Sequence, residues 1–221
     1  TDIFRNEYLS PRSPYTTLQI PKQGIGEWCH PLHTVDINDA GLRSSVQNGI
    51  LNTELGIPFR TPAEGHNVAF TSLWGNYPDS LEIPLKGKAS RAYLLMAGST
   101  NHMQCHIDNG VIRIYYKDGT RDVMFLRNPD NWPPIEHIFF EDGLAFNRHT
   151  PALYRLRLKT GEISNNFGEE LGFPGASREL DGGAAVLLEM PLNPGKKLSH
   201  LVLETLSNDV VIGLMSITLQ R

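Results

Sequence analysis

Hydrophobic residues along most of this chain alternate with polar residues over short runs, which is typical of half-buried β-strands rather than of helices. The clearest example is the run 110–126, in which Ile112 and Ile114 point to one face before a turn signal at Asp118 and Gly119. Asp-Gly supplies the positive φ angles of a tight hairpin turn, so we predict a β-hairpin here. Helical periodicity is not sustained over three turns anywhere in the chain, so we expect no long helix.

Further strands are predicted between turns that are rich in Gly, Pro, Asn and Asp. In Leu81–Leu85, the position of Pro84 favours an edge strand, because proline cannot donate a ladder hydrogen bond. Arg91–Ala97 is almost continuously apolar, as expected of a central strand. The remaining predicted strands are Asn67–Leu73, Ala152–Leu158, Ala184–Met190, His200–Leu206 and Asp209–Gln220. Many short strands with frequent turns predict an all-β fold, an antiparallel sandwich or barrel.

The first 35 residues differ from the rest, with prolines at positions 11, 14, 21 and 31. We expect residues 1–35 to form an extended lead segment that packs on or links to a preceding domain, and residues 36–221 to form the β-sandwich. Within the lead segment, Thr16–Ile20 is a candidate edge strand. Because the chain begins at Thr1 rather than Met, we expect the natural product to be longer or processed.

Composition and charge limit the classes of partner that we expect for this chain. The 221 residues carry a net charge of −4, which argues against a nucleic-acid partner because such binding rests on neutralising many phosphates. No apolar run approaches the ~20 residues of a membrane span, so we expect no membrane insertion. The two cysteines, Cys29 and Cys105, form a disulfide or remain separate thiols; the sequence leaves both alternatives open.

Motifs of enzyme active sites are absent: there is no GxSxG elbow, no HExxH, no phosphate loop and no dinucleotide fingerprint after a strand. A pair of carboxylates is the remaining route to glycosidic chemistry. Nothing in their sequence context singles out any of the candidates, which are Glu136, Glu141, Asp142, Glu169 and Glu170. We therefore assign no catalytic residue and predict that this chain by itself is not an enzyme.

The sequence contains residue types suited to two kinds of metal site, zinc and calcium. Short clusters of zinc-ligand types occur at Cys29, His30 and His33, and at His102, Cys105 and His106. Their spacing is not that of a zinc ribbon or finger, so half-buried polar loops are the favoured interpretation. The segments Asn128–Asn131 and Asp108–Asn109 supply the oxygens that a structural calcium would need, although Asx-rich turns commonly do so without an ion. We expect no metal site and no cofactor, with structural calcium as the weaker alternative.

Large aromatic residues stand in two turn-like segments, SLWGNYPDS (72–80) and NPDNWPPIEH (128–137). A carbohydrate site needs a flat ring with polar groups beside it. The candidate carbohydrate-binding residues are therefore Trp74, Asn76, Tyr77, Asn131 and Trp132. The competing interpretation is that these rings close the end of a core. Trp74 directly follows a predicted strand and is the better candidate for such a plug, whereas Tyr77 is the better candidate to meet a sugar.

Four blocks of the chain together resemble a galactose-binding-like jelly roll of a family of carbohydrate-binding modules. The blocks are DAGLR (39–43), GIPFRTP (56–62), NVAFTSLWGNYPDSLEIPLKGKASRAYLLMAGSTN (67–101) and YYKDGTRDVMFLRNPDNW (115–132). More narrowly, they look like the C-terminal region of large secreted proteins from polysaccharide-degrading gut bacteria, which are similar to glycoside hydrolases. The resemblance is weakest over 161–182, and it brings no catalytic or binding residue with it.

The resemblance implies a secreted, periplasmic or cell-surface protein of which this chain is an accessory domain. We expect a non-catalytic β-sandwich that accompanies a preceding glycoside-hydrolase domain of the same chain and binds carbohydrate through its end loops. Binding would keep the linked hydrolase near its substrate by raising the effective concentration. The alternatives are a structural module that braces the catalytic domain, and a domain that contributes to a glycosidase active site.

Overall fold

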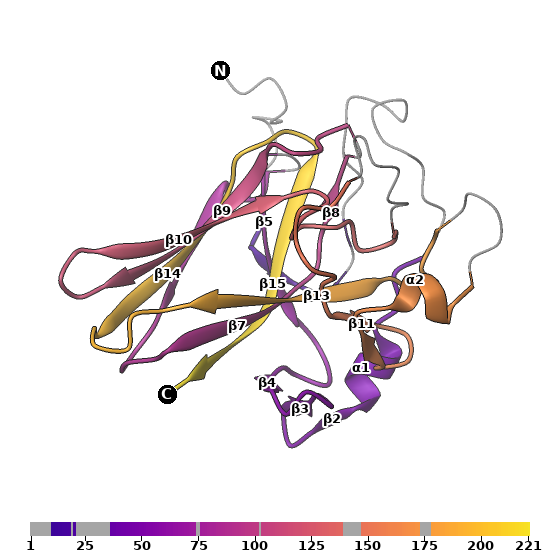
Figure 1. Cartoon of the computed structure of the whole chain (residues 1–221), viewed down its shortest axis with the longest axis horizontal. Helices are drawn as coiled ribbons and strands as arrows, with labels where there is room; N and C mark the ends of the chain where they lie inside the picture. The colour runs from indigo at the N-terminus through magenta and orange to yellow at the C-terminus, as the bar shows by residue number, and fades with distance from the viewer. Residues whose placement is uncertain are drawn as a thin grey trace.

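The computed structural model describes residues 10–18, 20, 36–73, 76–101, 103–138, 147–172 and 178–221. In this part of the chain the protein is an antiparallel β-sandwich with two short helices, α1 (Ala40–Ser44) and α2 (Phe167–Glu170) (Figure 1). The all-β sandwich predicted from the alternating pattern is thus confirmed. The helices span five and four residues, in agreement with the lack of sustained helical periodicity.

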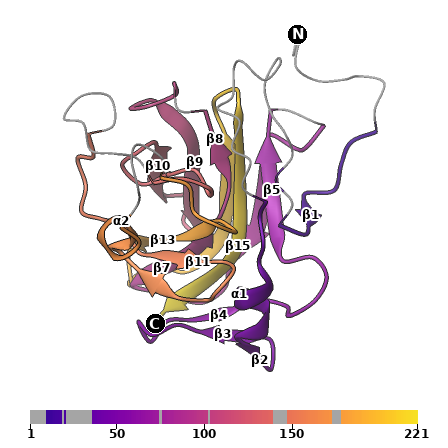
Figure 2. The same ribbon diagram turned by 90° about the vertical axis from the view of Figure 1, so that its right-hand side faces the viewer.

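The larger sheet contains eight strands of the described chain, in the order β1-β5-β15-β7-β13-β11-β12, with β8 added beside β15. Its strands are β1 (Tyr15–Thr16), β5 (Val68–Ser72), β7 (Arg91–Met96), β8 (Ser99–Thr100), β11 (Arg155–Arg157), β12 (Ile163–Ser164), β13 (Ala184–Pro191) and β15 (Val210–Gln220). Every ladder in it is antiparallel. Figure 2 shows β1 beside β5, at one edge of this sheet.

The second layer is a four-stranded antiparallel sheet in the order β10-β9-β14-β6. It is built from β6 (Ser80–Pro84), β9 (Asp108–Tyr116), β10 (Arg121–Arg127) and β14 (Leu198–Thr205). A small sheet, β2 (Val46–Gln47), β3 (Ile50–Asn52) and β4 (Pro58–Arg60), lies with α1 at one end of the molecule (Figure 2). Its two- and three-residue strands are too short to show a period in the sequence.

The larger sheet is buried on both faces. Alternate residues of β7 separate into two clusters: Leu94 and Met96 join the core between the two large sheets, whereas Leu95 joins a second core on the opposite face. That second core also contains Leu42 of α1 and Phe59 of β4. The nearly continuous apolar sequence of β7 follows from this arrangement, because a strand buried on both sides needs apolar residues at every position.

The structure confirms the predicted central strand and the predicted edge strand. β7 lies between β15 and β13, as predicted for a central strand, and β6 pairs only with β14, so Pro84 occupies an edge. The turn of the β9–β10 hairpin differs from the prediction. Only Gly119 has a positive φ, +83°, whereas Asp118 accepts hydrogen bonds from the Thr120 main-chain N–H and hydroxyl. The turn therefore needs one left-handed residue, and Asp118 acts through its side chain.

The described part of the lead segment contacts the sandwich. β1 pairs with β5, so the predicted edge strand exists, although it covers Tyr15–Thr16 rather than Thr16–Ile20. Leu18 is buried in the second core, and the Arg12 main-chain N–H donates to the Asn76 carbonyl at 2.8 Å. Among the described residues, no helix has the length and apolarity needed to cross a membrane.

Candidate functional site

Two of the predicted carbohydrate-binding residues form part of the core or of its supporting turn. Trp132 is 0% exposed and belongs to the core between the two large sheets, so neither face of its indole is open to a sugar. Asn131 holds the preceding turn: its amide oxygen accepts from the Arg127 main-chain N–H at 2.7 Å, and its amide nitrogen donates to the Phe125 carbonyl at 2.9 Å. The structural interpretation therefore holds for both residues.

The other aromatic segment gives a similar correction. Tyr77, the ring expected to meet a sugar, is 7% exposed and packs edge-on against Phe70, with ring centroids 5.9 Å apart. The Arg12 guanidinium lies 5.3 Å from the centroid of the Tyr77 ring. Asn76 is buried and adopts a left-handed φ of +60° in the turn. Trp74 lies outside the described residues. The Tyr77 ring thus closes the end of the core and is not exposed on the surface.

These candidates also do not converge. Tyr77 belongs to the core on one face of the eight-stranded sheet, whereas Trp132 belongs to the core on the other face. One binding surface cannot use both rings. Of the two short Cys/His clusters considered as zinc ligands, Cys29, His30, His33 and His102 lie outside the described residues. The alternatives for Cys29 and Cys105 are therefore untested.

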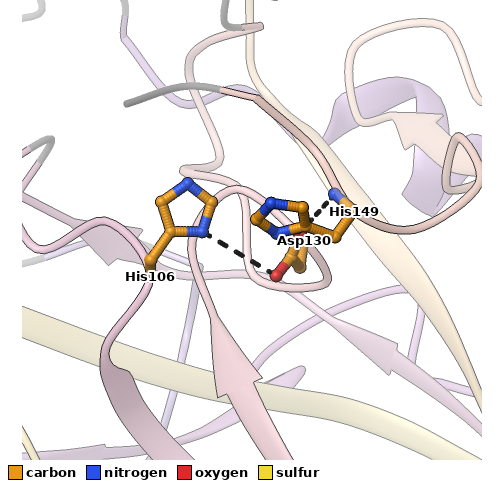
Figure 3. Close-up of side chains that lie close together, drawn as sticks. All are labelled: His106, Asp130 and His149. Carbon is orange, nitrogen blue, oxygen red and sulfur yellow. Dashed lines mark hydrogen bonds and ion pairs between the residues drawn. The ribbon is translucent and has the colours of Figure 1, made fainter. Parts of the chain in front are cut away.

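A cluster that the sequence did not single out joins three separate connections of the fold. His106 lies in the β8–β9 turn, Asp130 follows β10, and His149 precedes β11. Their ligating atoms all lie within 4.8 Å of one another. Figure 3 shows both imidazole rings beside the carboxylate of Asp130, which Nδ1 of His106 approaches to 4.0 Å and Nδ1 of His149 to 3.5 Å.

Main-chain contacts position these side chains. The β8–β9 turn is joined to the segment after β10 by a bridge between Cys105 and Asn128, and the His106 main-chain N–H donates to the Asn128 carbonyl at 2.7 Å. His106 has a φ of +57°, a left-handed conformation that is uncommon for a residue other than glycine. The turn thus directs the imidazole toward the segment that carries Asp130.

The segment containing His149 is held by Asp130 itself. The His149 main-chain N–H donates to Oδ1 of Asp130 at 2.7 Å, and the Thr150 hydroxyl donates to the Asp130 carbonyl at 2.6 Å. The side chain of Asp130 is only 16% exposed, whereas that of His149 is 63% exposed. A half-buried carboxylate and two imidazoles are a donor set that suits a divalent transition-metal ion.

The described chain also has a pocket of about 480 Å³. Its lining includes Pro129 and Arg148, which are the sequence neighbours of Asp130 and His149. Its other walls come from β11 and from the β12–α2 connection, including Asn165 and Asn166. Three arginines, Arg148, Arg155 and Arg178, line the pocket against a single acid, Glu169. The pocket thus combines amide groups, which suit hydroxyls, with an excess of positive charge.

Arg155 is the most buried of these arginines, with 6% of its surface exposed. Its guanidinium donates to the carbonyls of His137, Pro134, Ile135 and Ala184, at 2.6 to 3.1 Å. Burial lowers the pKa of Arg155 to about 10, while the charge of Glu136 acts in the opposite direction. At neutral pH the guanidinium remains charged, so Arg155 contributes a fixed positive charge to the pocket lining.

The acids considered for glycosidic chemistry that lie in the described chain are held by local contacts. Glu169 lines the pocket and accepts from the Asn166 amide at 2.9 Å, whereas Glu170 accepts from the Ser164 hydroxyl at 2.6 Å. Glu136 is buried beside Arg155, and Glu141 and Asp142 lie outside the described residues. Through these contacts the described acids help to hold the conformation of the loops.

Sequence reasoning identified parts of the histidine cluster but not the cluster itself. His106 was noted in HMQCH and Asp130 in NPDN, each with other expected partners, and His149 had no distinguishing neighbourhood. The three residues are 24 and 19 positions apart, so no short motif connects them. Comparison of the chain with protein-family models, with curated proteins and with solved structures yields no match.

Proposed function

We propose that this chain is a non-catalytic accessory β-sandwich, of the galactose-binding-like jelly-roll type, that binds acidic carbohydrate in the pocket beside α2. The observation that carries this proposal is the pocket's lining, in which three arginines and two asparagines stand against one glutamate. Asparagine amides can bond sugar hydroxyls, while guanidinium groups bind carboxylate or sulfate substituents.

The position of the pocket supports the same proposal. Most of its lining residues lie in connections and in α2. Figure 1 shows α2 at one side of the sandwich, whose regular strands supply the rigid frame. Binding residues are often carried by loops on such a frame. The sequence resemblance described above adds the setting: a secreted, periplasmic or cell-surface protein in which the module accompanies a glycoside-hydrolase domain. There it would raise the concentration of the hydrolase at its polysaccharide.

The proposal is tested by titrating the chain with matched oligosaccharides, one series neutral and one bearing uronate or sulfate groups, and measuring the heat of binding. We expect the acidic series to bind more tightly. Because a charge-assisted hydrogen bond contributes about 1.5–3 kcal/mol, Arg148→Gln or Arg178→Gln should weaken acidic-ligand binding about tenfold or more. Arg60→Gln, an exposed change on β4, is the matched control and should leave affinity unchanged.

Two results would contradict this function. One is the absence of heat with every acidic oligosaccharide at millimolar concentration. The other is equal binding of the neutral and acidic series, with Arg148→Gln and Arg178→Gln behaving like Arg60→Gln. In either case the arginines would serve only to hold the surrounding loops, as Arg155 already does for four carbonyls.

A further inference from the structure

The side chain of Asp130 is mostly buried and lies beside two imidazoles. Among the described residues, its ion-pair contacts are those with the two histidines. The charge of Asp130 also acts on Arg127, whose guanidinium donates its hydrogen bond to Asp108 at 2.6 Å. Asp130 therefore faces two imidazoles whose neutral forms offer lone pairs, which is an arrangement of three donors around one point.

We propose that His106, Asp130 and His149 form a binding site for one divalent transition-metal ion, with Zn²⁺ as the probe. Two imidazole nitrogens and one carboxylate oxygen are ligands that zinc accepts, and three protein ligands leave a fourth position for water or a ligand. This proposal rests on the geometry of the three side chains and is independent of the carbohydrate proposed for the pocket.

The distances suit such an ion. Ligand atoms in a tetrahedral zinc site lie about 3.3 Å apart, because each bond to the metal is about 2.0–2.1 Å long. Oδ1 of the Asp130 carboxylate lies 3.5 Å from Nδ1 of His149, and Oδ2 lies 4.0 Å from Nδ1 of His106. The imidazole centroids are 4.9 Å apart and their planes are inclined by 52°, so the rings are neither stacked nor turned away from each other. Small rotations of the His106 and His149 side chains would close the remaining gaps.

The surrounding structure fixes two of the three ligands in advance. The position of the His106 backbone is set by its hydrogen bond to Asn128, and Asp130 is anchored through His149 and Thr150. Oδ1 of Asp130 accepts the His149 main-chain N–H, which fixes the orientation of the carboxylate beside both imidazoles and leaves Oδ2 and the second lone pair of Oδ1 for the metal. Such outer contacts orient ligands and commonly change metal affinity 10- to 100-fold.

The experiment is a competition titration of Zn²⁺ between a chromogenic chelator and the chain, freed of any polyhistidine tag. The proposal expects one Zn²⁺ per chain with micromolar or tighter affinity, and a rise in the thermal unfolding midpoint that a chelator reverses. His149→Ala and Asp130→Asn should each weaken binding at least tenfold. His66→Ala removes an exposed histidine outside the cluster and should bind like the parent.

A second signal separates this site from other histidines of the chain. Co²⁺ bound by imidazole and carboxylate ligands gives visible absorption bands that depend on coordination, and His149→Ala should abolish them. His149 is largely exposed, so circular dichroism should show that this variant is folded. The proposal is overturned if the parent binds no Zn²⁺ in this range, or if His149→Ala and Asp130→Asn retain the affinity and the Co²⁺ spectrum of the parent.

Discussion

Gly98 lies directly against the indole of Trp132: a Cβ atom placed on Gly98 would come within 2.6 Å of Cζ2 of that ring and even closer to the Val211 carbonyl. Trp132 is the largest of the fully buried side chains of the described chain. The ring fits between the sheets because Gly98, which follows β7, carries no side chain. This relationship assigns Trp132 a structural role.

Gly98→Ala is accordingly expected to destabilise the protein by about 1–3 kcal/mol, the usual cost of overpacking a well-filled core. The measurement is the free energy of unfolding in urea. Gly168→Ala is the matched control, because a Cβ there would meet only the Arg178 side chain at 3.8 Å. If both variants unfold at the same urea concentration as the parent, the contact between Gly98 and Trp132 is not tight.

Replacement of Arg155 should have a larger effect. Arg155→Met would remove the donors of four carbonyl groups and a buried positive charge that interacts with Glu136, so we expect a loss of about 3–5 kcal/mol in the free energy of unfolding. Arg155→Lys should rescue little, because one ammonium cannot reproduce the planar fork. Arg121→Met, on the exposed hairpin, is the control; an equal effect of both methionine variants would refute the role given to Arg155.

The hairpin turn should confer acid sensitivity. Hydrogen bonds from Thr120, followed by the contact with Lys196, lower the pKa of Asp118 from 3.8 to about 2. A carboxyl with a lowered folded-state pKa adds stability above its unfolded pKa, and this contribution is lost as pH falls from about 4 to 2. The thermal midpoint of Asp118→Asn should therefore change less over this interval than that of the parent. Parallel pH profiles would contradict this.

Asn109 should affect the metal site without touching it. Its buried amide accepts from the Thr100 hydroxyl at 2.6 Å and donates to the carbonyls of Gln104 and Ile107, so it shapes the turn that carries His106. Asn109→Ala should lower stability by about 2–3 kcal/mol and weaken Zn²⁺ binding several-fold. Asn193→Ala, which removes one hydrogen bond in the β13–β14 turn, should leave Zn²⁺ affinity unchanged. Unaltered affinity in Asn109→Ala would show that the turn keeps its shape without this amide.

The regular part of the fold was predictable because burial leaves a local trace in the sequence. Alternation identified β9, and the apolar run of β7 indicated a central strand. The strands β2 to β4 escaped notice because two or three residues cannot display a period of two. Their role follows from long-range packing, since Phe59 fills a core that also contains Leu187 of β13.

The site was harder to predict, because its parts are distant in sequence. Tyr77 and Trp132 were candidates for ligand contact because turn residues surround them, with a core plug as the competing interpretation. Both rings are buried, since a turn at the end of a sandwich can also direct a ring inward. Nothing in the spacing of the three metal-site ligands links them, and only the joining of Cys105 with Asn128 brings the first two together. Turn chemistry predicted the loops correctly, but not the direction in which their side chains point.

The place of β15 in the larger sheet has a consequence for biosynthesis. This strand lies between β5 and β7, both of which are made long before it, so each keeps an unpaired edge until the eleven residues of β15 leave the ribosome. The sandwich therefore closes late rather than growing strand by strand during translation. A nascent chain stalled before Val210 is expected to be cleaved readily by added protease, whereas one that has released Gln220 should resist.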